Sequence, residues 1–205
     1  ILEIGSGTGY IAESLISSGY INYYISELYY NGLIYSKKRG FKKLIKFDIT
    51  KIPTPIKNEF DVICMFDILD HLDNDNQILE NIRAILKKEG YLLLTVPAHK
   101  LLWSGIDVVS GHKRRYSKKT ISKLLSDCGY EVIFINYFFF FIFPFLFIRA
   151  ILNKKIKNKK YNIEKKSGLD LNIIINSIFN FLSFIDYLIF KIIPYPFGGS
   201  LIVVG

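Results

Sequence analysis

The sequence predicts an α/β fold, a doubly wound seven-stranded sheet with helices on both faces, and three observations support this class. The chain opens with a short apolar segment that runs directly into three alternating glycines. Short apolar segments, several ending in a carboxylate, then alternate with amphipathic stretches of helical period. One more apolar segment of strand length, Ser200 to Val204, ends the chain. The 205 residues suffice for a single domain with a sizeable core, and we expect one domain over 1–205.

The first nine residues, ILEIGSGTG, predict a strand, a tight turn and the start of a helix. Glycine allows positive φ and lets a ligand approach the main chain closely. The N-terminus of the following helix directs free N–H groups at that ligand. Gly5, Gly7 and Gly9 have the spacing E-x-G-x-G-x-G, in which the third glycine comes one residue earlier than in the dinucleotide-binding pattern. The turn therefore predicts a nucleotide-like cofactor and disfavours a nicotinamide dinucleotide.

Strands and helices are expected to alternate after this turn. Helices are expected at 11–18, 28–39 and 74–88, and from a cap at Ser117 to 128. Further strands are expected at 21–26, 44–47, 60–66, 91–96, 130–136 and 200–204. The segment FDVICMF at 60–66 is almost continuously apolar, which is typical of a central strand buried on both faces.

Two carboxylates stand where the second and third strands are expected to end. Glu27 follows the strand at 21–26, and Asp48 follows the strand at 44–47. In a doubly wound sheet, a carboxylate at the tip of the second strand can accept hydrogen bonds from both ribose hydroxyls of an adenosine cofactor. The separation of Gly5 and Glu27 fits one helix and one strand, although an acid at a strand end can also simply face solvent.

The net charge of +9 is concentrated in one segment, because eight basic residues and one acidic residue lie between Arg149 and Lys166. A local basic patch beside apolar segments favours a membrane surface over nucleic acid. Cys64 and Cys128 lack metal-site spacing, and no secretory signal is visible. We therefore expect reduced thiols in a cytoplasmic protein, with contact at the inner face of the membrane. Because the chain starts inside a strand, without Met, we also expect a preceding helix to be missing.

About sixty residues separate the last two expected strands, and they form an insertion at 137–196 that is apolar, then basic, then apolar again. Pro144 and Arg149 interrupt the first apolar segment and Asp186 the second, so neither is an uncharged run of about 20 residues that must span a bilayer. The second segment also carries a polar stripe on one helix face, formed by Asn172, Asn176, Asn180, Ser183 and Tyr187. Three interpretations stay open: a helical subdomain packed on the sheet edge, an interfacial anchor or lipid-binding lid, or a spanning helix.

The order and spacing of these features from Gly5 to Val96 resemble the class I S-adenosylmethionine-dependent methyltransferases. The glycine turn, the two strand-end carboxylates, the F-D-x-I strand and the passage K-K-E-G before a strand carry the resemblance. It implies a Rossmann-like fold whose seventh strand is antiparallel and inserted between the fifth and sixth. It also implies S-adenosylmethionine as the cofactor, bound by Glu3, Gly5, Ser6, Gly7, Gly9, Glu27, Asp48, Ile49, Phe66 and Asp67. Asp48 would bond the adenine amino group, and Phe66 or Asp67 would lie near the methionine end.

His71 is the candidate general base, because it follows the fourth strand, where the acceptor should lie, and histidine titrates near neutral pH. The segment Asp67-x-x-Asp70-His71 resembles the E-x-x-E-H segment of ubiquinone-type O-methyltransferases, with Asp in place of Glu. That resemblance implies a divalent cation, whereas the shorter acids argue against one, and we assign no metal ligand. A cap for the next helix explains Asp70 and His71 equally well.

A second polar and aromatic group follows the fifth strand, where it can roof the acceptor pocket. Paired arginines with a histidine and a tyrosine suit an anionic group such as phosphate, since guanidinium binds oxyanions through two hydrogen bonds. The candidate substrate-binding residues are His99, Trp103, Arg114, Arg115 and Tyr116, and His112 is a second catalytic candidate. A solvated basic loop is the competing interpretation, and Trp103 can equally be a core residue.

The block V-P-A…L-W-S…D…G-H-x-R-R-Y, ending at Tyr116, and the C-terminal P-F-G-x-S-L resemble a narrower subgroup of these methyltransferases. Its members are similar to proteins often encoded beside polyprenyl-phosphate glycosyltransferases. The sequence thus predicts transfer of a methyl group to a small molecule, a lipid or a lipid-linked glycan, with no nucleic acid partner. Two alternatives stay open: a catalytically inactive, membrane-associated binding protein with the same fold, and a nicotinamide-dependent oxidoreductase.

Overall fold

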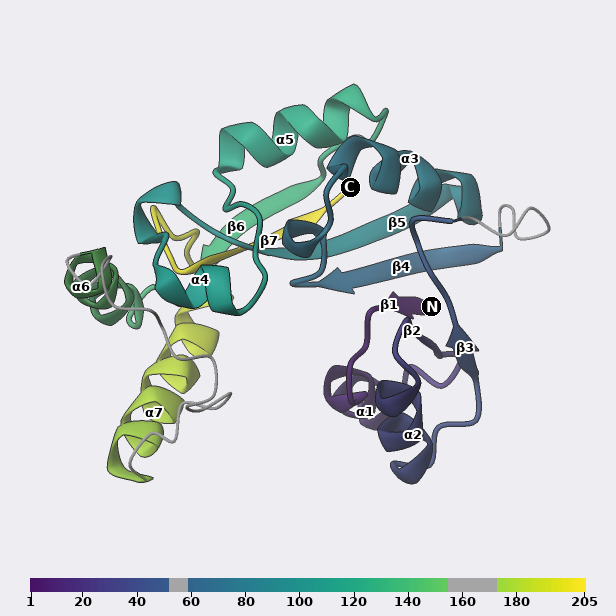
Figure 1. The fold of residues 1–205 in the computed structure, drawn as a ribbon, viewed down its shortest axis with the longest axis horizontal. Helices are drawn as coiled ribbons and strands as arrows, with labels where there is room; N and C mark the ends of the chain where they lie inside the picture. Colours follow the sequence, from purple (N-terminus) through teal and green to yellow (C-terminus); the bar gives the residue numbers. More distant parts are fainter. Residues whose placement is uncertain (52–58, 155–172) are drawn as a thin grey trace.

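A seven-stranded sheet forms the centre of the computed structural model, which describes residues 1–51, 59–154 and 173–205 (Figure 1). The strand order is β3-β2-β1-β4-β5-β7-β6. Strand β7 pairs antiparallel with β5 and β6, whereas the other pairs are parallel. The predicted fold class is confirmed, including the antiparallel last strand between the fifth and sixth.

The elements follow the predicted order, and the predicted insertion between β6 and β7 contains helices. The strands are β1 (Leu2–Ile4), β2 (Tyr24–Glu27), β3 (Leu44–Lys46), β4 (Phe60–Phe66), β5 (Leu86–Pro97), β6 (Phe134–Phe138) and β7 (Ser200–Val204). The α-helices of the described ranges are α1 (Tyr10–Ser17), α2 (Tyr30–Lys38), α3 (Asp75–Ile85), α4 (Gly105–Val109), α5 (Lys118–Asp127), α6 (Phe143–Lys154) and α7 (Ile173–Phe190). Two short 3-10 helices, η1 (Leu69–His71) and η2 (Lys100–Leu102), follow β4 and β5.

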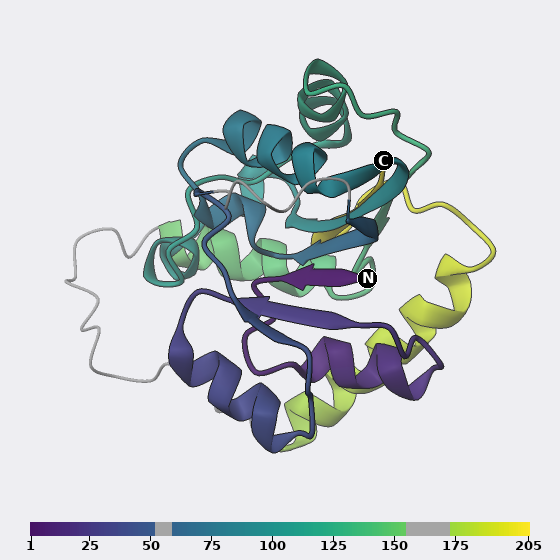
Figure 2. The ribbon, with the colours of Figure 1, turned by 90° about the vertical axis from the view of Figure 1, so that its right-hand side faces the viewer.

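Helices lie on both faces of the sheet, with α3 and α5 on one face and α1, α2 and α7 on the other (Figures 1 and 2). The main core includes Ile63 of β4 and Leu92 and Leu94 of β5, all fully buried. Burying a side chain of this size stabilises the fold by roughly 1.5–3 kcal/mol. A smaller cluster joins Ala12 of α1 to Ile25 of β2. The predicted buried central strand at 60–66 is therefore the one that the core surrounds.

The boundary between α3 and β5 differs from the prediction. Helix α3 ends at Ile85 rather than at 88, and β5 begins directly with Leu86, which is buried and pairs with Phe60. Gly90, expected to stop the helix, lies inside β5. A Cβ atom there would come within 2.9 Å of the Leu86 side chain, so the glycine serves close packing within the sheet.

Strands β2 and β6 both begin later than predicted. Ile21 is 83% exposed, and pairing with β1 starts only at Tyr24. The Tyr130 side chain is buried, and its hydroxyl donates to the Leu79 carbonyl of α3 at 2.9 Å. Tyr130 thus belongs to the core contact with α3, and the chain pairs with β7 only from Phe134.

Helices α6 and α7 form the described part of the insertion, and much of their apolar surface is exposed. The exposed fractions of Phe181 and Phe184 in α7 are 62% and 56%. Asn176 and Asn180 of the predicted polar stripe are also exposed. Asn172 and the basic stretch 155–166 lie outside the described residues.

No helix within the described ranges combines the length and the apolar character needed to cross a membrane.

Candidate active site

The turn between β1 and α1 is shaped by glycines. Gly5, Gly7 and Gly9 have φ values of 71°, 55° and 76°, which L-residues with side chains rarely adopt. The amides of Gly5 and Ser6 donate to the Ser26 carbonyl of β2 at 2.9 and 3.1 Å, which anchors the turn to the sheet. On its other side the turn is open, since nothing lies within 4 Å of the position that a Gly7 Cβ atom would take.

Glu27, at the end of β2, is buried, and its carboxylate accepts hydrogen bonds from three backbone amides. Oε2 accepts from the Gly7 amide at 2.8 Å, and Oε1 accepts from Leu28 at 2.8 Å and Tyr29 at 3.1 Å. An ionised carboxylate has about four acceptor sites, so Oε2 retains one. Glu27 therefore fixes the glycine turn and keeps one acceptor site, and its predicted contact with a ribose hydroxyl stays a prediction.

Gly32 of α2 belongs to the same site, although it is not among the predicted residues. A Cβ atom at Gly32 would lie 2.6 Å from the Gly7 carbonyl oxygen and 2.7 Å from Cγ of Glu27. Real Cβ atoms do not approach other atoms so closely, so glycine is what allows α2 to pack against the turn. The available sequence signal is a glycine inside an expected helix, which costs about 1 kcal/mol relative to alanine and calls for a packing reason.

Gly32→Ala is expected to lower the free energy of unfolding by about 1–3 kcal/mol, because the added methyl group overpacks the contact with the turn. The added methyl group should also displace the glycine turn and so weaken cofactor binding. Asn31→Ala is the matched control, since Asn31 is exposed on the same helix. Urea denaturation and titration calorimetry measure both effects. Equal stability and equal affinity in the two variants would contradict the proposed packing role.

Glu3, Asp48 and Ile49 of the predicted cofactor set have other partners. Glu3 is 2% exposed, its Oε2 accepts from the Tyr23 hydroxyl at 2.7 Å, and burial raises its pKa. Ile49 is 5% exposed and packs in the main core. Asp48 Oδ1 accepts from the amide and hydroxyl of Thr50 at 3.0 and 2.6 Å, and this side chain still reaches the surface. Glu3 and Ile49 therefore have buried side chains that pack behind the site, and their contacts with the cofactor stay predictions.

An unpaired polar atom in the turn is compatible with a bound adenosyl cofactor. The Ser6 hydroxyl oxygen is buried without a hydrogen-bond partner in the described ranges, and a bound ligand would supply one. Gly7 faces open space, and Glu27 keeps a free acceptor site. Ser6, Gly7, Glu27 and Asp48 would thus hold the cofactor.

Phe66 and Asp67 lie where β4 ends, next to β1. Asp67 has a φ of 52°, a conformation uncommon outside glycine, and its amide donates to both oxygens of Thr95 at 3.0 and 3.1 Å. Ile68 covers Gly5, since a Cβ atom on that glycine would lie 2.5 Å from Cδ1 of Ile68. The segment after β4 therefore packs over the glycine turn, which brings the predicted donor and acceptor regions together.

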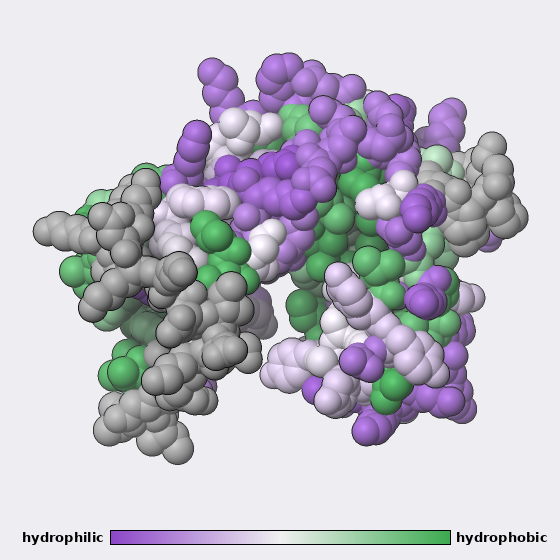
Figure 3. Space-filling view, in the orientation of Figure 1, coloured by the Kyte–Doolittle hydropathy of each residue, from purple (hydrophilic) through white to green (hydrophobic). Residues whose placement is uncertain are grey.

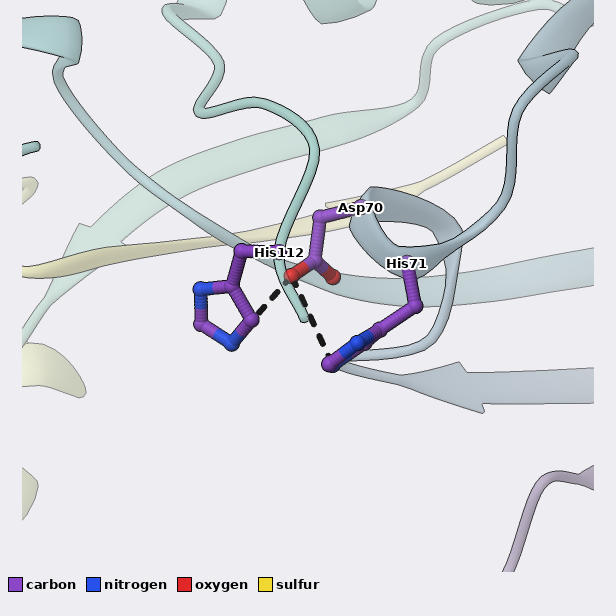
Figure 4. A group of neighbouring side chains, drawn as sticks. All are labelled: Asp70, His71 and His112. Atoms are coloured by element: carbon purple, nitrogen blue, oxygen red, sulfur yellow. Dashed lines mark ion pairs between the residues drawn. The ribbon is translucent and has the colours of Figure 1, made fainter. Parts of the chain in front are cut away.

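Asp70, His71 and His112 meet at this edge, although His112 is distant in sequence (Figure 4). Asp70 is fully buried in η1, and its carboxylate faces both imidazole rings, which meet edge-on with centroids 4.7 Å apart. Asp70 Oδ2 is 3.8 Å from Nε2 of His71 and 3.6 Å from Nε2 of His112. Neither Asp70 oxygen has a hydrogen-bond partner within the described parts of the chain, and burial raises the pKa of this carboxyl. The two predicted catalytic histidines thus share one buried acid.

Asp107, the acid of the block that ends at Tyr116 but not one of the predicted site residues, orients His112. Asp107 Oδ1 lies 3.1 Å from Nδ1 of His112 and accepts from Nε of Arg115 at 2.7 Å. Asp107 Oδ2 accepts from the Ser104 amide at 2.8 Å and so caps α4. The contact with Asp107 raises the pKa of His112, which keeps its proton to higher pH than an ordinary histidine. The capping-box spacing of Ser104 and Asp107 was the available sequence signal.

Arg114, Arg115 and Tyr116 hold this region together through contacts within the protein, and their role in substrate binding stays a prediction. The Arg115 side chain is 9% exposed, and besides Asp107 it donates to the Ala98 carbonyl at 3.0 Å. Arg114 pairs with Asp75 at 2.8 Å, and the buried Tyr116 donates its hydroxyl to the same carboxylate at 3.1 Å. These guanidinium groups position the loop, and an anion could accept hydrogen bonds only from their remaining N–H groups.

A pocket of about 400 Å³ nevertheless lies beside this group, and its walls are formed by Lys100, Trp103, Lys113, Arg114 and Arg115. Four of these five side chains are cationic, and three of them pair with acids: Lys113 with Asp73, Arg114 with Asp75 and Arg115 with Asp107. Trp103 is half-buried and lines the pocket, which agrees with its placement among the substrate candidates.

His99 stands apart from the Asp70 group. It has a φ of 56°, and its ring stacks on Tyr137 of β6 with centroids 4.8 Å apart and meets Phe143 of α6 edge-on at 5.6 Å. Its Nε2 is buried without a partner, and burial lowers its pKa. His99 thus contacts the insertion and is not brought to the predicted acid–base residues.

The group formed by Asp70, His71 and His112 could also hold a metal ion. Donor atoms of Asp70, His71 and His112 lie within 4.8 Å of one another, close enough to share a divalent cation. Asp67 is not a member, so this is not the acid-x-x-acid-His set that the resemblance implies. One carboxylate with two imidazoles also works as an acid–base group without metal, and the absence of a metal ligand stays a prediction.

Comparison with known proteins defines the class. A family model described as a methyltransferase domain matches residues 1–134, most of the chain. The chain therefore belongs to the methyltransferase-domain family, and its activity is methyl transfer. This finding removes the nicotinamide-dependent oxidoreductase from consideration. None of the curated proteins matches the chain in sequence.

Solved structures with a similar fold are also methyltransferases. A SAM-dependent methyltransferase from Archaeoglobus fulgidus is 14% identical with a TM-score of 0.59, over 99% of this chain and 83% of that one. A SAM-dependent methyltransferase from Thermotoga maritima is 18% identical with a TM-score of 0.60, over 100% and 80%. The glycopeptide N-methyltransferase MtfA, complexed with S-adenosylmethionine, is 15% identical with a TM-score of 0.54, over 67% and 78%. At these identities the likeness concerns the fold.

Proposed function

We propose that this methyltransferase uses S-adenosylmethionine and methylates a lipid or a lipid-linked glycan. The observation that carries the proposal is the placement of Asp70, His71 and His112 beside the glycine turn, at the carboxyl ends of parallel strands. The named use of S-adenosylmethionine by proteins of similar fold supports the cofactor. When bound, the cofactor supplies the methyl group, and Ser6, Gly7, Glu27 and Asp48 orient it.

In this proposal Asp70, His71 and His112, the acid–base group, have different roles. Methyl transfer from a sulfonium is an in-line displacement, so the acceptor must be held in near-attack geometry, and a hydroxyl or amine must also lose a proton. His71, the more exposed imidazole at 36%, takes that proton. His112 keeps its own proton through Asp107 and balances the buried charge of Asp70. Asp70 positions both rings and does not touch the acceptor.

Titration calorimetry with the intact chain tests the cofactor assignment. We expect S-adenosylmethionine to bind with a dissociation constant in the micromolar range, typical of enzyme ligands. An absence of binding under conditions where the protein is folded by circular dichroism would overturn the proposal.

The acceptor is inferred from the basic pocket beside the acid–base group. A phosphate or another anionic group fits a pocket lined by Lys100, Lys113, Arg114 and Arg115, and lipid-linked glycans carry such a group. Incubation with methyl-labelled cofactor and separate lipid, glycan and protein extracts identifies the acceptor class. Label that enters the protein fraction alone would contradict a lipid or glycan acceptor.

We also infer that residues 1–205 act as one methyltransferase domain whose insertion, 137–196, contacts the membrane surface. Exposed aromatic residues on α7 and the basic composition of 154–166 support this inference, since apolar and cationic groups together favour anionic lipid. The proposed location is the cytoplasm, with contact at the cytoplasmic face of the membrane. No other partner is proposed.

Anionic liposomes are expected to retain the intact protein in a flotation assay and to release a variant lacking Lys154–Phe190. Because that deletion removes part of the fold, the double variant Phe181→Glu, Phe184→Glu is the sharper test: both side chains are exposed, and charge opposes insertion into lipid. The control is Tyr20→Glu, an exposed aromatic residue far from the insertion in sequence. If the intact protein does not float, the membrane inference is wrong.

A further inference from the structure

A second, apolar cavity lies between α7 and the face of the sheet that α7 covers. Its volume is about 360 Å³, within the range of small-molecule sites. Thr95 of β5 and Ile202 of β7, which pair in register, line it from the sheet, and Phe139 and Phe190 contribute aromatic walls. The space-filling view shows hydrophobic residues beside the part of the molecule that carries α1 and α2 (Figure 3).

One buried acid lines this apolar cavity without a full set of partners. Asp186 of α7 is 5% exposed, and its Oδ1 accepts from the Phe140 amide at 3.2 Å. Its Oδ2 is buried and has no hydrogen-bond partner among the described residues, and the nearby Tyr195 hydroxyl donates to the Asp186 main-chain carbonyl at 3.0 Å. Because an unpaired buried carboxylate oxygen is costly, a ligand that carries a hydrogen-bonding group would relieve the cost. Burial also raises the pKa of Asp186, and a hydroxyl can pair with either protonation state, by donating or by accepting.

The cavity adjoins the catalytic edge of the sheet. Thr95, in its wall, accepts through Oγ1 from the amide of Asp67, the residue that follows β4 over the glycine turn. Phe139, also in the wall, has a φ of 60°, a strained conformation for a bulky residue. Asp67 and Phe139 directly follow β4 and β6, and His99 is the second residue after β5. These three strands run in the same direction, so the three residues lie at one edge of the sheet. Strain of this kind concentrates at ligand sites.

We propose that this cavity binds the apolar portion of the methyl acceptor, a prenyl or alkyl chain bearing a hydroxyl that pairs with Asp186. The inference rests on the proposed function, because it assigns the hydrophobic part of the acceptor to a place beside the donor. The insertion then has a direct role in substrate binding, since α7 supplies one wall of the site.

Farnesol, a prenyl alcohol, is the probe, and farnesene, its hydrocarbon counterpart, is the comparison. Titration calorimetry with the intact chain should show micromolar farnesol binding and about tenfold weaker binding of farnesene. Ser183→Trp, which fills the cavity from α7, should weaken farnesol binding at least tenfold. Asn180→Trp, exposed on the same helix and outside the lining, is the matched control and should bind farnesol normally. Asp186→Ala should remove the preference for the alcohol.

S-adenosylmethionine affinity, measured on the same samples, separates this inference from the proposed function. Normal cofactor binding with no farnesol binding, or with equal farnesol affinity in Ser183→Trp and Asn180→Trp, would overturn the cavity assignment alone. Farnesol binding that depends on Ser183 in a protein without cofactor affinity would overturn the proposed function and leave the cavity as a lipid site. Circular dichroism melting confirms that each variant is folded.

Discussion

Glu27→Ala is expected to weaken S-adenosylmethionine binding by about a hundredfold, equivalent to about 3 kcal/mol. The variant loses an acceptor for the ribose and also the carboxylate that holds the amides of Gly7, Leu28 and Tyr29. A hydrogen bond to a charged group contributes roughly 1.5–3 kcal/mol, so the ligand contact and the loss of turn geometry together account for an effect of this size. Titration calorimetry at constant salt measures it.

Glu13→Ala is the matched control for this variant. Glu13 lies in α1, next to the same turn in sequence, but its carboxylate is exposed and pairs with Arg39. Exposed ion pairs contribute about 0–1 kcal/mol, so the control should bind the cofactor within about twofold of the parent protein. If Glu27→Ala remained within threefold of the parent, the carboxylate would have a purely structural role. A melting temperature is needed for both variants, because Glu27 also supports the fold locally.

The parts of the site that could be predicted are those fixed by local sequence. Gly5, Gly7 and Gly9 require positive φ within one turn, and Glu27 stands at a strand tip, so periodicity and spacing suffice to place them. The nearly continuous apolar run of β4 likewise identifies a central strand without any tertiary information.

The parts that could not be predicted depend on contacts between distant segments. Gly32 matters because α2 meets the glycine turn, and Asp107 matters because its loop folds back toward η1 and Asp70. The two arginines also show that contacts between distant segments cannot be read from composition. Arg114 and Arg115 have the composition of an anion site, but nearby carboxylates and carbonyls take most of their hydrogen bonds. Composition shows which ligands a side chain can bind. Only the fold decides whether its hydrogen-bonding groups are already paired within the protein.

His71→Gln is expected to lower methyl transfer by about a hundredfold or more while leaving cofactor affinity unchanged, because a positioned general base contributes about 10²–10⁴-fold. Glutamine preserves most of the side-chain size but cannot take a proton. The measurement is the initial rate of label transfer into the responsive extract at saturating cofactor, with calorimetry on the same samples. Lys123→Gln is the control, since Lys123 is exposed on α5 and pairs only with Asp127 at the surface.

Asp70→Asn separates positioning from proton transfer in the same assay. The substitution removes the buried charge that lies 3.8 Å from Nε2 of His71 and 3.6 Å from Nε2 of His112, so it should slow transfer by about tenfold or more with little change in cofactor affinity. Residues that act as a unit are strongly non-additive, so the double variant Asp70→Asn, His71→Gln should be no slower than His71→Gln alone. Multiplied losses in the double variant, or more than a tenth of the parental rate in His71→Gln, would show that proton removal does not pass through this pair.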